Sequence, residues 1–159
     1  MAFYGNEPVR FSKVSMVTAT LGANDPQVGA TTRDGDEEYL FVYNTGGSTI
    51  NVGHGCTVSA VTGYSVTVSS VTSVDILVGV CKHSAIATTE YGWVVTRGWS
   101  SIEMNGSSGT VAAGGLCELG TDGVFSPISN TTGNKSPSVV KAMEAIVSSA
   151  SGQAFISVT

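Results

Sequence analysis

The stretch that decides the fold class is Val74-Asp-Ile-Leu-Val-Gly-Val80. Apolar β-branched residues stand at positions 74, 76, 78 and 80, and this period of two predicts a strand with these residues on one buried face. Leu77 lies on the opposite face, so we expect the strand to be covered on both sides. The residues from Tyr39 to this strand show no helical periodicity, which favours an all-β protein.

Further strands are predicted on the N-terminal side of this stretch. Tyr39–Asn44 is aromatic and β-branched, and the turn residues Thr45-Gly-Gly-Ser48 end it. The segments Val58–Val61 and Tyr64–Ser69 lie on either side of Gly63 and also have strand composition.

On the C-terminal side, Gly92-Trp-Val-Val-Thr-Arg-Gly98 predicts a strand with Trp93, Val95 and Arg97 on one face. Ile102 and Met104 indicate a second, short strand after it. Asn105-Gly106 is expected to turn the chain after this second strand.

The last 45 or so residues predict turns and one ambiguous segment. Asp122-Gly123 before Val124 is typical of a hairpin with a primed turn. Val139–Val147 contains good helix formers, but it also fits the first arm of a terminal hairpin whose second arm ends at Val158; we favour the hairpin. No internal repeat at a fixed period is evident.

Composition excludes several classes of function. The chain has 159 residues, of which 12% are charged, about half the average of about 25%. Seven Lys and Arg and a net charge of −5 argue against a nucleic-acid partner. No apolar run is long enough to span a membrane as a helix, so we expect no membrane partner.

The predicted organisation has two parts. Residues 1–38 contain prolines and turn formers, with Val14–Thr20 as one possible strand, and are expected to form an extended N-terminal arm. Residues 39–159 are expected to form a single β-rich domain, an antiparallel sandwich or a barrel-like fold. Met1-Ala-Phe-Tyr-Gly-Asn-Glu-Pro8 does not resemble a secretory signal, so the three cysteines are expected to be reduced thiols.

Candidate chemistry is limited to a few residues. His54-x-Cys56 and Cys81-x-His83 would surround a tetrahedral zinc if the two segments were neighbours, or else each Cys is a small core residue and each His lies at a strand end. A Cys–His pair with Asp75 lacks a nucleophile motif. We therefore expect no enzymatic activity, no metal and no cofactor.

Other polar and aromatic residues are expected to have structural or binding roles. The carboxylates of Glu90, Glu103 and Glu118 lie beside turn residues and are expected to be solvated. Trp93, inside a strand, is expected in the core, whereas Trp99, after Gly98, is expected to be an exposed ring at a protein interface.

Three segments carry a family resemblance: Glu90-Tyr-Gly-Trp-Val-Val-Thr-Arg-Gly98, Val111-Ala-Ala-Gly-Gly-Leu116 and Gly120-Thr-Asp-Gly-Val124. They resemble the strand, "Ala-Ala-Gly" and hairpin motifs of tailed-bacteriophage capsid decoration (cement) proteins, over roughly residues 75–159. Gly115 departs from that pattern, because such proteins commonly have an acidic residue there.

The resemblance implies a structural virion protein on the outer capsid surface, made in the host cytoplasm. Such a protein binds the major capsid protein as a homotrimer and stabilises contacts between capsid subunits. The partner interface expected on this basis includes Phe3, Tyr4, Arg10 and Phe11 of the arm, to which the exposed Trp99 is added. The alternative is a phage fibre or tail module that recognises a host surface glycan through Trp99 and Tyr91.

Overall fold

The computed structural model describes residues 14–23, 25–59, 64–68, 76–107, 109–128 and 139–158. Their regular secondary structure is almost entirely β, which confirms the predicted fold class. The elements are β1 (Val17–Thr18), β2 (Thr31–Asp34), β3 (Glu37–Asn44), β4 (Gly55–Val58), β5 (Ser65–Val68), β6 (Leu77–Cys81), β7 (Tyr91–Glu103), β8 (Leu116–Leu119), the 3₁₀ turn η1 (Thr121–Gly123), β9 (Phe125–Pro127), β10 (Val139–Ala142) and β11 (Ser151–Ser157).

Five strands close into a first small barrel. β3 pairs with β7, β7 with β6, β6 with β4, and β4 with β5, all antiparallel. β5 then pairs with β3 in the parallel direction, through Tyr43 opposite Ser65 and Asn44 opposite Val66. The ring of pairings leaves no free edge within the barrel, which is the general way in which a barrel avoids exposed strand edges.

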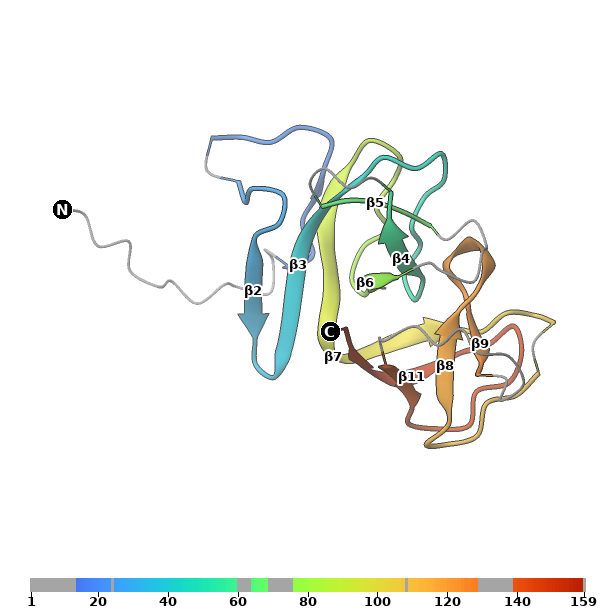
Figure 1. Ribbon diagram of the computed structural model, residues 1–159. Helices are drawn as coiled ribbons and strands as arrows, with labels where there is room; N and C mark the ends of the chain where they lie inside the picture. Colours follow the sequence, from blue (N-terminus) through green and yellow to red (C-terminus); the bar gives the residue numbers. More distant parts are fainter. Residues whose placement is uncertain are drawn as a thin grey trace.

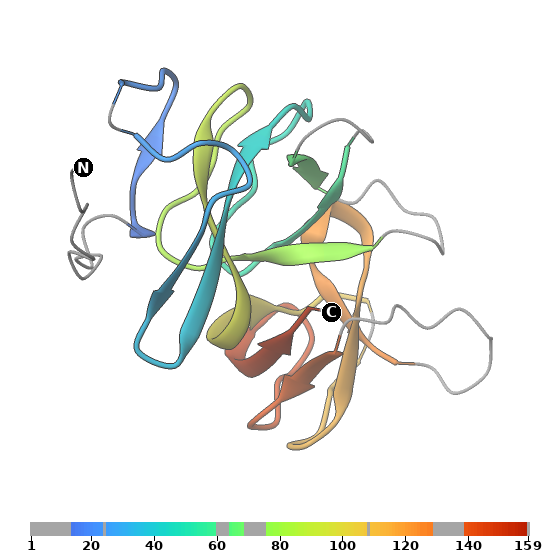
Figure 2. The same cartoon turned by 60° about the vertical axis from the view of Figure 1, so that its left-hand side comes forward.

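A second barrel is built in the same way from the C-terminal half. β7 pairs with β11, β11 with β10, β10 with β8, and β8 with β9. A parallel bridge between Met104 and Phe125 returns from β9 to the end of β7 and closes the ring. The two barrels share β7, which runs from the side of β3 to the side of β8 and β11 and bends between them (Figure 1). Figure 2 shows the two groups of strands, one above the other, from a second direction.

The two barrels are copies of one structural unit, offset by about 60 residues. Ile50 and Ile86 exchange two backbone hydrogen bonds of 3.0 Å, and so do Val111 and Ile146. Thr89 and Ser149 hold the same positive φ, 65° and 58°. The repeat is not evident in the sequence, because the two copies share few identical residues, chiefly turn glycines and the Ile that follows Ala85 and Ala145.

Equivalent positions fill the two barrel interiors. In the first barrel they form one buried cluster, and in the second they belong to a larger cluster that also includes residues between the barrels. The equivalent buried pairs are Val42 and Ile102, Ile50 and Val111, Cys56 and Cys117, Val66 and Phe125, Cys81 and Ala142, Ile86 and Ile146, and Val94 and Ala154.

The predicted faces of β6 require correction. Thr57 lies opposite Leu77 and Cys56 opposite Gly79, so Val78 is an extra residue that breaks the alternation. Leu77 and Val80 consequently share one cluster, while Ile76, expected on the buried face, is 54% exposed.

The strand around Trp93 is longer than predicted. Trp93 and Val95 lie in one buried cluster as expected, but β7 continues through Gly98 to Glu103 instead of ending there. Gly98 has a φ of 120°, which glycine adopts without steric cost, and the strand therefore bends without breaking.

Two predicted hairpins are confirmed. Asp122 and Gly123 have φ values of 57° and 81°, and the Val124 N–H donates to the Thr121 carbonyl, as in a primed turn. Residues 139–142 form β10, which pairs with β11, so the hairpin and not the helix is correct for this segment.

Part of the expected arm belongs to the sheet. β2 pairs with β3 along its whole length, and β1 pairs with β7 through Val17 and Thr18. Val14 is buried, and Met16 and Ala30 pack against the same cluster. Within the described residues 14–23 and 25–38, β1, β2 and Val14 therefore pack on strands of the first barrel.

Candidate functional site

The two cysteines of the suggested zinc site lie inside the first barrel. Cys56 and Cys81 are fully buried, and neither forms a disulfide. Burial raises the pKa of the Cys81 thiol to about 12 and also raises that of Cys56. The two thiols are therefore protonated, and they serve as small core residues, as one of the two interpretations proposed.

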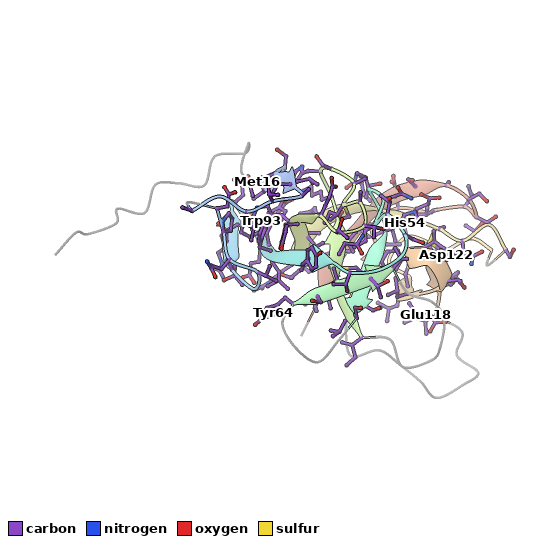
Figure 3. The ribbon with its side chains drawn as sticks, turned by 90° about the horizontal axis from the view of Figure 1, so that it is seen from above. Met16, His54, Tyr64, Trp93, Glu118 and Asp122 are labelled. Atoms are coloured by element: carbon purple, nitrogen blue, oxygen red, sulfur yellow. The ribbon has the colours of Figure 1, made fainter. Side chains whose placement is uncertain are left out.

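The two histidines contact residues other than the two cysteines. His54 Nε2 is 3.1 Å from Glu103 Oε2, and the turn at Gly123 lies against the His54 ring (Figure 3). His83 instead stacks on Tyr39, with ring centroids 5.8 Å apart. The paired strands β4 and β6 do bring the two segments together, but the described residues contain no group of three His, Cys, Asp or Glu side chains that would hold a metal.

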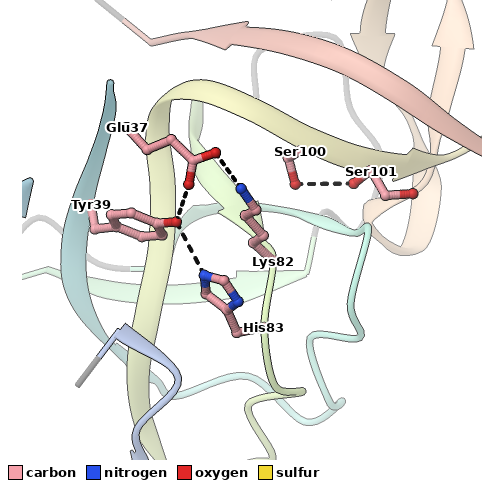
Figure 4. Close-up of polar contacts among 6 residues, drawn as sticks. All are labelled: Glu37, Tyr39, Lys82, His83, Ser100 and Ser101. Atoms are coloured by element: carbon pink, nitrogen blue, oxygen red, sulfur yellow. Dashed lines mark hydrogen bonds and ion pairs between the residues drawn. The ribbon is translucent and has the colours of Figure 1, made fainter. Parts of the chain in front are cut away.

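A polar cluster of Glu37, Tyr39, Lys82 and His83 lies at the end of the first barrel (Figure 4). Glu37 accepts hydrogen bonds from the Tyr39 hydroxyl and the Lys82 ammonium group. The Tyr39 oxygen is also 3.1 Å from His83 Nε2. The cluster joins β3 to the segment after β6, and its carboxylate is neutralised by Lys82, as a partly buried charge requires.

Burial sets the proton affinities in this cluster. The pKa of Tyr39 is raised, first by burial and then by the Glu37 carboxylate. The pKa of His83 is lowered, first by burial and then by the neighbouring Lys82 charge. Both groups are therefore neutral at pH 7, and the cluster has the character of a structural tie between strands.

Trp93 and Trp99 lie as the sequence predicted. Trp93 is 6% exposed and contacts Phe41, with ring centroids 5.0 Å apart. Trp99 is 45% exposed and stands edge-on to Phe155, at 5.8 Å between centroids. Trp99 is thus on the surface of the second barrel, where a partner can reach it.

Three further residues continue the surface that Trp99 begins. The sheet register places Trp99 opposite Phe155, Phe155 opposite Lys141, and Lys141 opposite Leu116. We call these four residues the open row. Leu116 is 45% exposed, and Lys141 is exposed as well. Sequence reasoning identified only Trp99, because the other three join it through pairings between distant strands.

Tyr91 does not share this surface. It stands eight positions before Trp99 on β7, roughly 26 Å along an extended strand. Its ring packs on Tyr43 and Phe41, with centroids 4.4 and 6.3 Å away. The two aromatic residues that the glycan hypothesis combined are therefore not brought together.

The carboxylates expected to be solvated are only partly so. Glu90 accepts a hydrogen bond of 2.9 Å from the Ala87 N–H, and Glu103 pairs with His54. Glu118 lies half-buried at the surface of the second barrel (Figure 3). Phe3, Tyr4, Arg10, Phe11 and Asp75 lie outside the described residues. The described part of the chain also contains no helix with the length and apolar character needed to cross a membrane.

The comparisons with known proteins give a fold likeness. The chain is similar to the N base of the head fiber gp8.5 in bacteriophage phi29, with a TM-score of 0.53 and 12% sequence identity. The likeness covers 75% of this chain and 92% of that one. No protein-family model matches the sequence, and no curated protein matches it either.

Proposed function

We propose that this chain is a structural protein of a phage virion that binds the outer surface of the capsid and stabilises contacts between major capsid subunits. The observation that carries the proposal is the fold shared with the base of a phage head fiber, over 92% of that chain. The sequence motifs that resemble capsid decoration proteins are independent of this likeness, and they point to the same class of protein.

The chemistry of the described residues is compatible with a binding role. The thiols are buried and protonated, and the two histidines are held by Glu103 and Tyr39. The exposed apolar side chains of the open row offer a contact surface. On this proposal the chain binds the major capsid protein as a homotrimer, without enzymatic activity, cofactor or nucleic acid.

The test is co-sedimentation of the purified chain with capsids that lack it. The fold decides which variants are useful. A chain that begins at Tyr39 would lose β1, β2 and the buried Val14, so its failure to bind would not identify the contact. A chain that begins at Val14 keeps every described residue and is the better truncation.

A full-length variant tests the predicted arm contacts directly. Phe3, Tyr4, Arg10 and Phe11 are replaced together by Ala, and a control chain carries Ala at Asn6, Glu7 and Ser12. We expect saturable binding by the intact and control chains and a loss of at least about tenfold in affinity for the fourfold variant. Absence of binding by the intact chain would overturn the proposed function.

The second candidate, a fibre module that recognises a host glycan, depends on the exposed Trp99. Saturable quenching of Trp fluorescence by host polysaccharide, lost in a Trp99→Ala variant, would support it. Binding to capsids without such quenching would favour the capsid role.

A further inference from the structure

The open row has an equivalent in the first barrel. Register through β3, β7, β6 and β4 aligns Tyr39, Val95, Val80 and Gly55. The internal repeat places these four residues at the positions of Trp99, Phe155, Lys141 and Leu116. Both rows cross the outer wall of their barrel, because the adjacent positions Leu40 and Ser100 are buried inside.

The row of the first barrel is buried, and one of its four residues, Gly55, packs directly on the second barrel. Tyr39, Val95 and Val80 are at most 1% exposed and belong to the cluster that contains Ile102 and Ile156. A Cβ atom on Gly55 would be 2.6 Å from Leu119 Cδ1 and 2.9 Å from Phe125 Cζ. The wall of this barrel unit is therefore a surface on which another β-barrel packs.

Among the described residues, nothing covers the row of the second barrel in this way. Trp99 and Leu116 each remain 45% exposed, and Met143, which follows β10, is 42% exposed. Lys141 lies between Phe155 and Leu116. A partner that covers the row must supply a negative charge for this ammonium group, because an unpaired buried charge is costly.

We propose that the open row is the surface through which copies of this chain associate with one another. A second copy provides what the row requires: apolar β-barrel wall of the kind that packs on Gly55 in the equivalent row, and carboxylates to face Lys141. The chain has 12 acidic residues against seven Lys and Arg, and Glu118 lies two positions from Leu116 on the same strand. This inference deepens the proposed function and rests on the part of it that makes the chain a homotrimer.

Sedimentation velocity of the full chain, between about 1 and 100 μM, tests the proposal because association depends on protomer concentration. We expect the intact chain to sediment as a multiple of 16.2 kDa. Trp99→Glu and Leu116→Glu should each raise the dissociation constant by more than about tenfold. Val58→Glu is the matched control, since Val58 is 52% exposed on the first barrel and should leave the mass unchanged.

The charge requirement has its own pair of variants. Lys141→Glu should weaken association, whereas Lys141→Arg should preserve it, because only the first reverses the charge in the row. Circular dichroism of each variant establishes that the fold is retained.

Two outcomes would overturn the proposal: an intact chain that is monomeric over the whole range, or Trp99 and Leu116 variants that associate like the intact chain. The assay contains no capsid, so it tests self-association separately from capsid binding. A monomer that still co-sediments with capsids would remove the homotrimer from the proposed function and leave its capsid binding standing. An oligomer that does not co-sediment with capsids would overturn the proposed function and leave self-association through the open row standing.

Discussion

Gly152 lies directly against Ile146, so that a Cβ atom added to the glycine would be 2.6 Å from Ile146 Cγ1. The same relationship recurs in the first barrel, where a Cβ on Gly92 would be 2.7 Å from Ile86 Cδ1. In both barrels the second residue of an antiparallel bridge, Ile86 opposite Ile50 and Ile146 opposite Val111, thus occupies the space that a side chain on the following strand would need.

This packing predicts the effect of a single added methyl group. Gly152→Ala should lower the free energy of unfolding by about 1–3 kcal/mol, measured by urea denaturation, because the well-packed interior has no room for it. Gly47→Ala is the control, since no heavy atom lies within 4 Å of its added Cβ. The Gly152→Ala, Ile146→Ala double variant should lose less stability than the sum of the losses in the two single variants. Strict additivity would contradict the contact.

The primed turn predicts unequal effects of substitution at two adjacent positions. Gly123 has a φ of 81°, and its added Cβ would be 2.7 Å from the Gly55 carbonyl oxygen, so Gly123→Ala should cost at least about 2 kcal/mol. Asp122→Gly should change stability by less than about 1 kcal/mol, since glycine adopts a positive φ readily. Thermal unfolding of the two variants checks this; equal losses would argue against the turn.

The buried thiols should be inert in the native state. The pKa of Cys117 is raised to about 11 and that of Cys81 to about 12, both by burial, and the pKa of Cys56 is raised as well. At pH 8 the three thiols should react with Ellman's reagent only after denaturation. A Ser151→Cys variant supplies an exposed thiol as the positive control. Rapid labelling of the native wild-type chain would contradict the burial.

His83 should make the protein less stable in mild acid. Burial and Lys82 lower the pKa of His83 in the folded state, so the unfolded state binds the proton more readily. The contribution of His83 to the free energy of unfolding is therefore present above the ordinary pKa of about 6.5. It is lost as the pH falls through the lower pKa of His83 in the folded state. Between pH 8 and 5, the free energy of unfolding should fall more in the wild type than in His83→Phe. The same fall in both chains would assign the effect to other groups.

The sequence predicted the parts of this fold that depend on neighbouring residues. Strand composition identified most strands, and Asp122-Gly123 identified the turn, because φ preferences act locally. The strand β2 was missed, since Thr31–Asp34 is polar and acquires its structure only by pairing with β3. The bulge at Val78 was missed for the same reason, because it is defined by the register of β4.

The repeat and the open row could not be predicted because they depend on distant residues. Cys56 and Cys117 are identical, but Val66 corresponds to Phe125, and Val94 to Ala154. Interiors of similar shape tolerate such exchanges as long as the total volume is kept. Trp99 was correctly predicted as exposed from its place after Gly98, whereas its neighbours on the surface come from β8, β10 and β11.

The shared strand β7 has a mechanical consequence. Two domains joined by a flexible linker transmit force through that linker, which extends before the force acts on the second domain. Here the strand Tyr91–Glu103 belongs to both barrels and is held by hydrogen bonds to its neighbours along its length. A pull on either barrel is therefore carried into the other along one continuous hydrogen-bonded strand, without a linker between them.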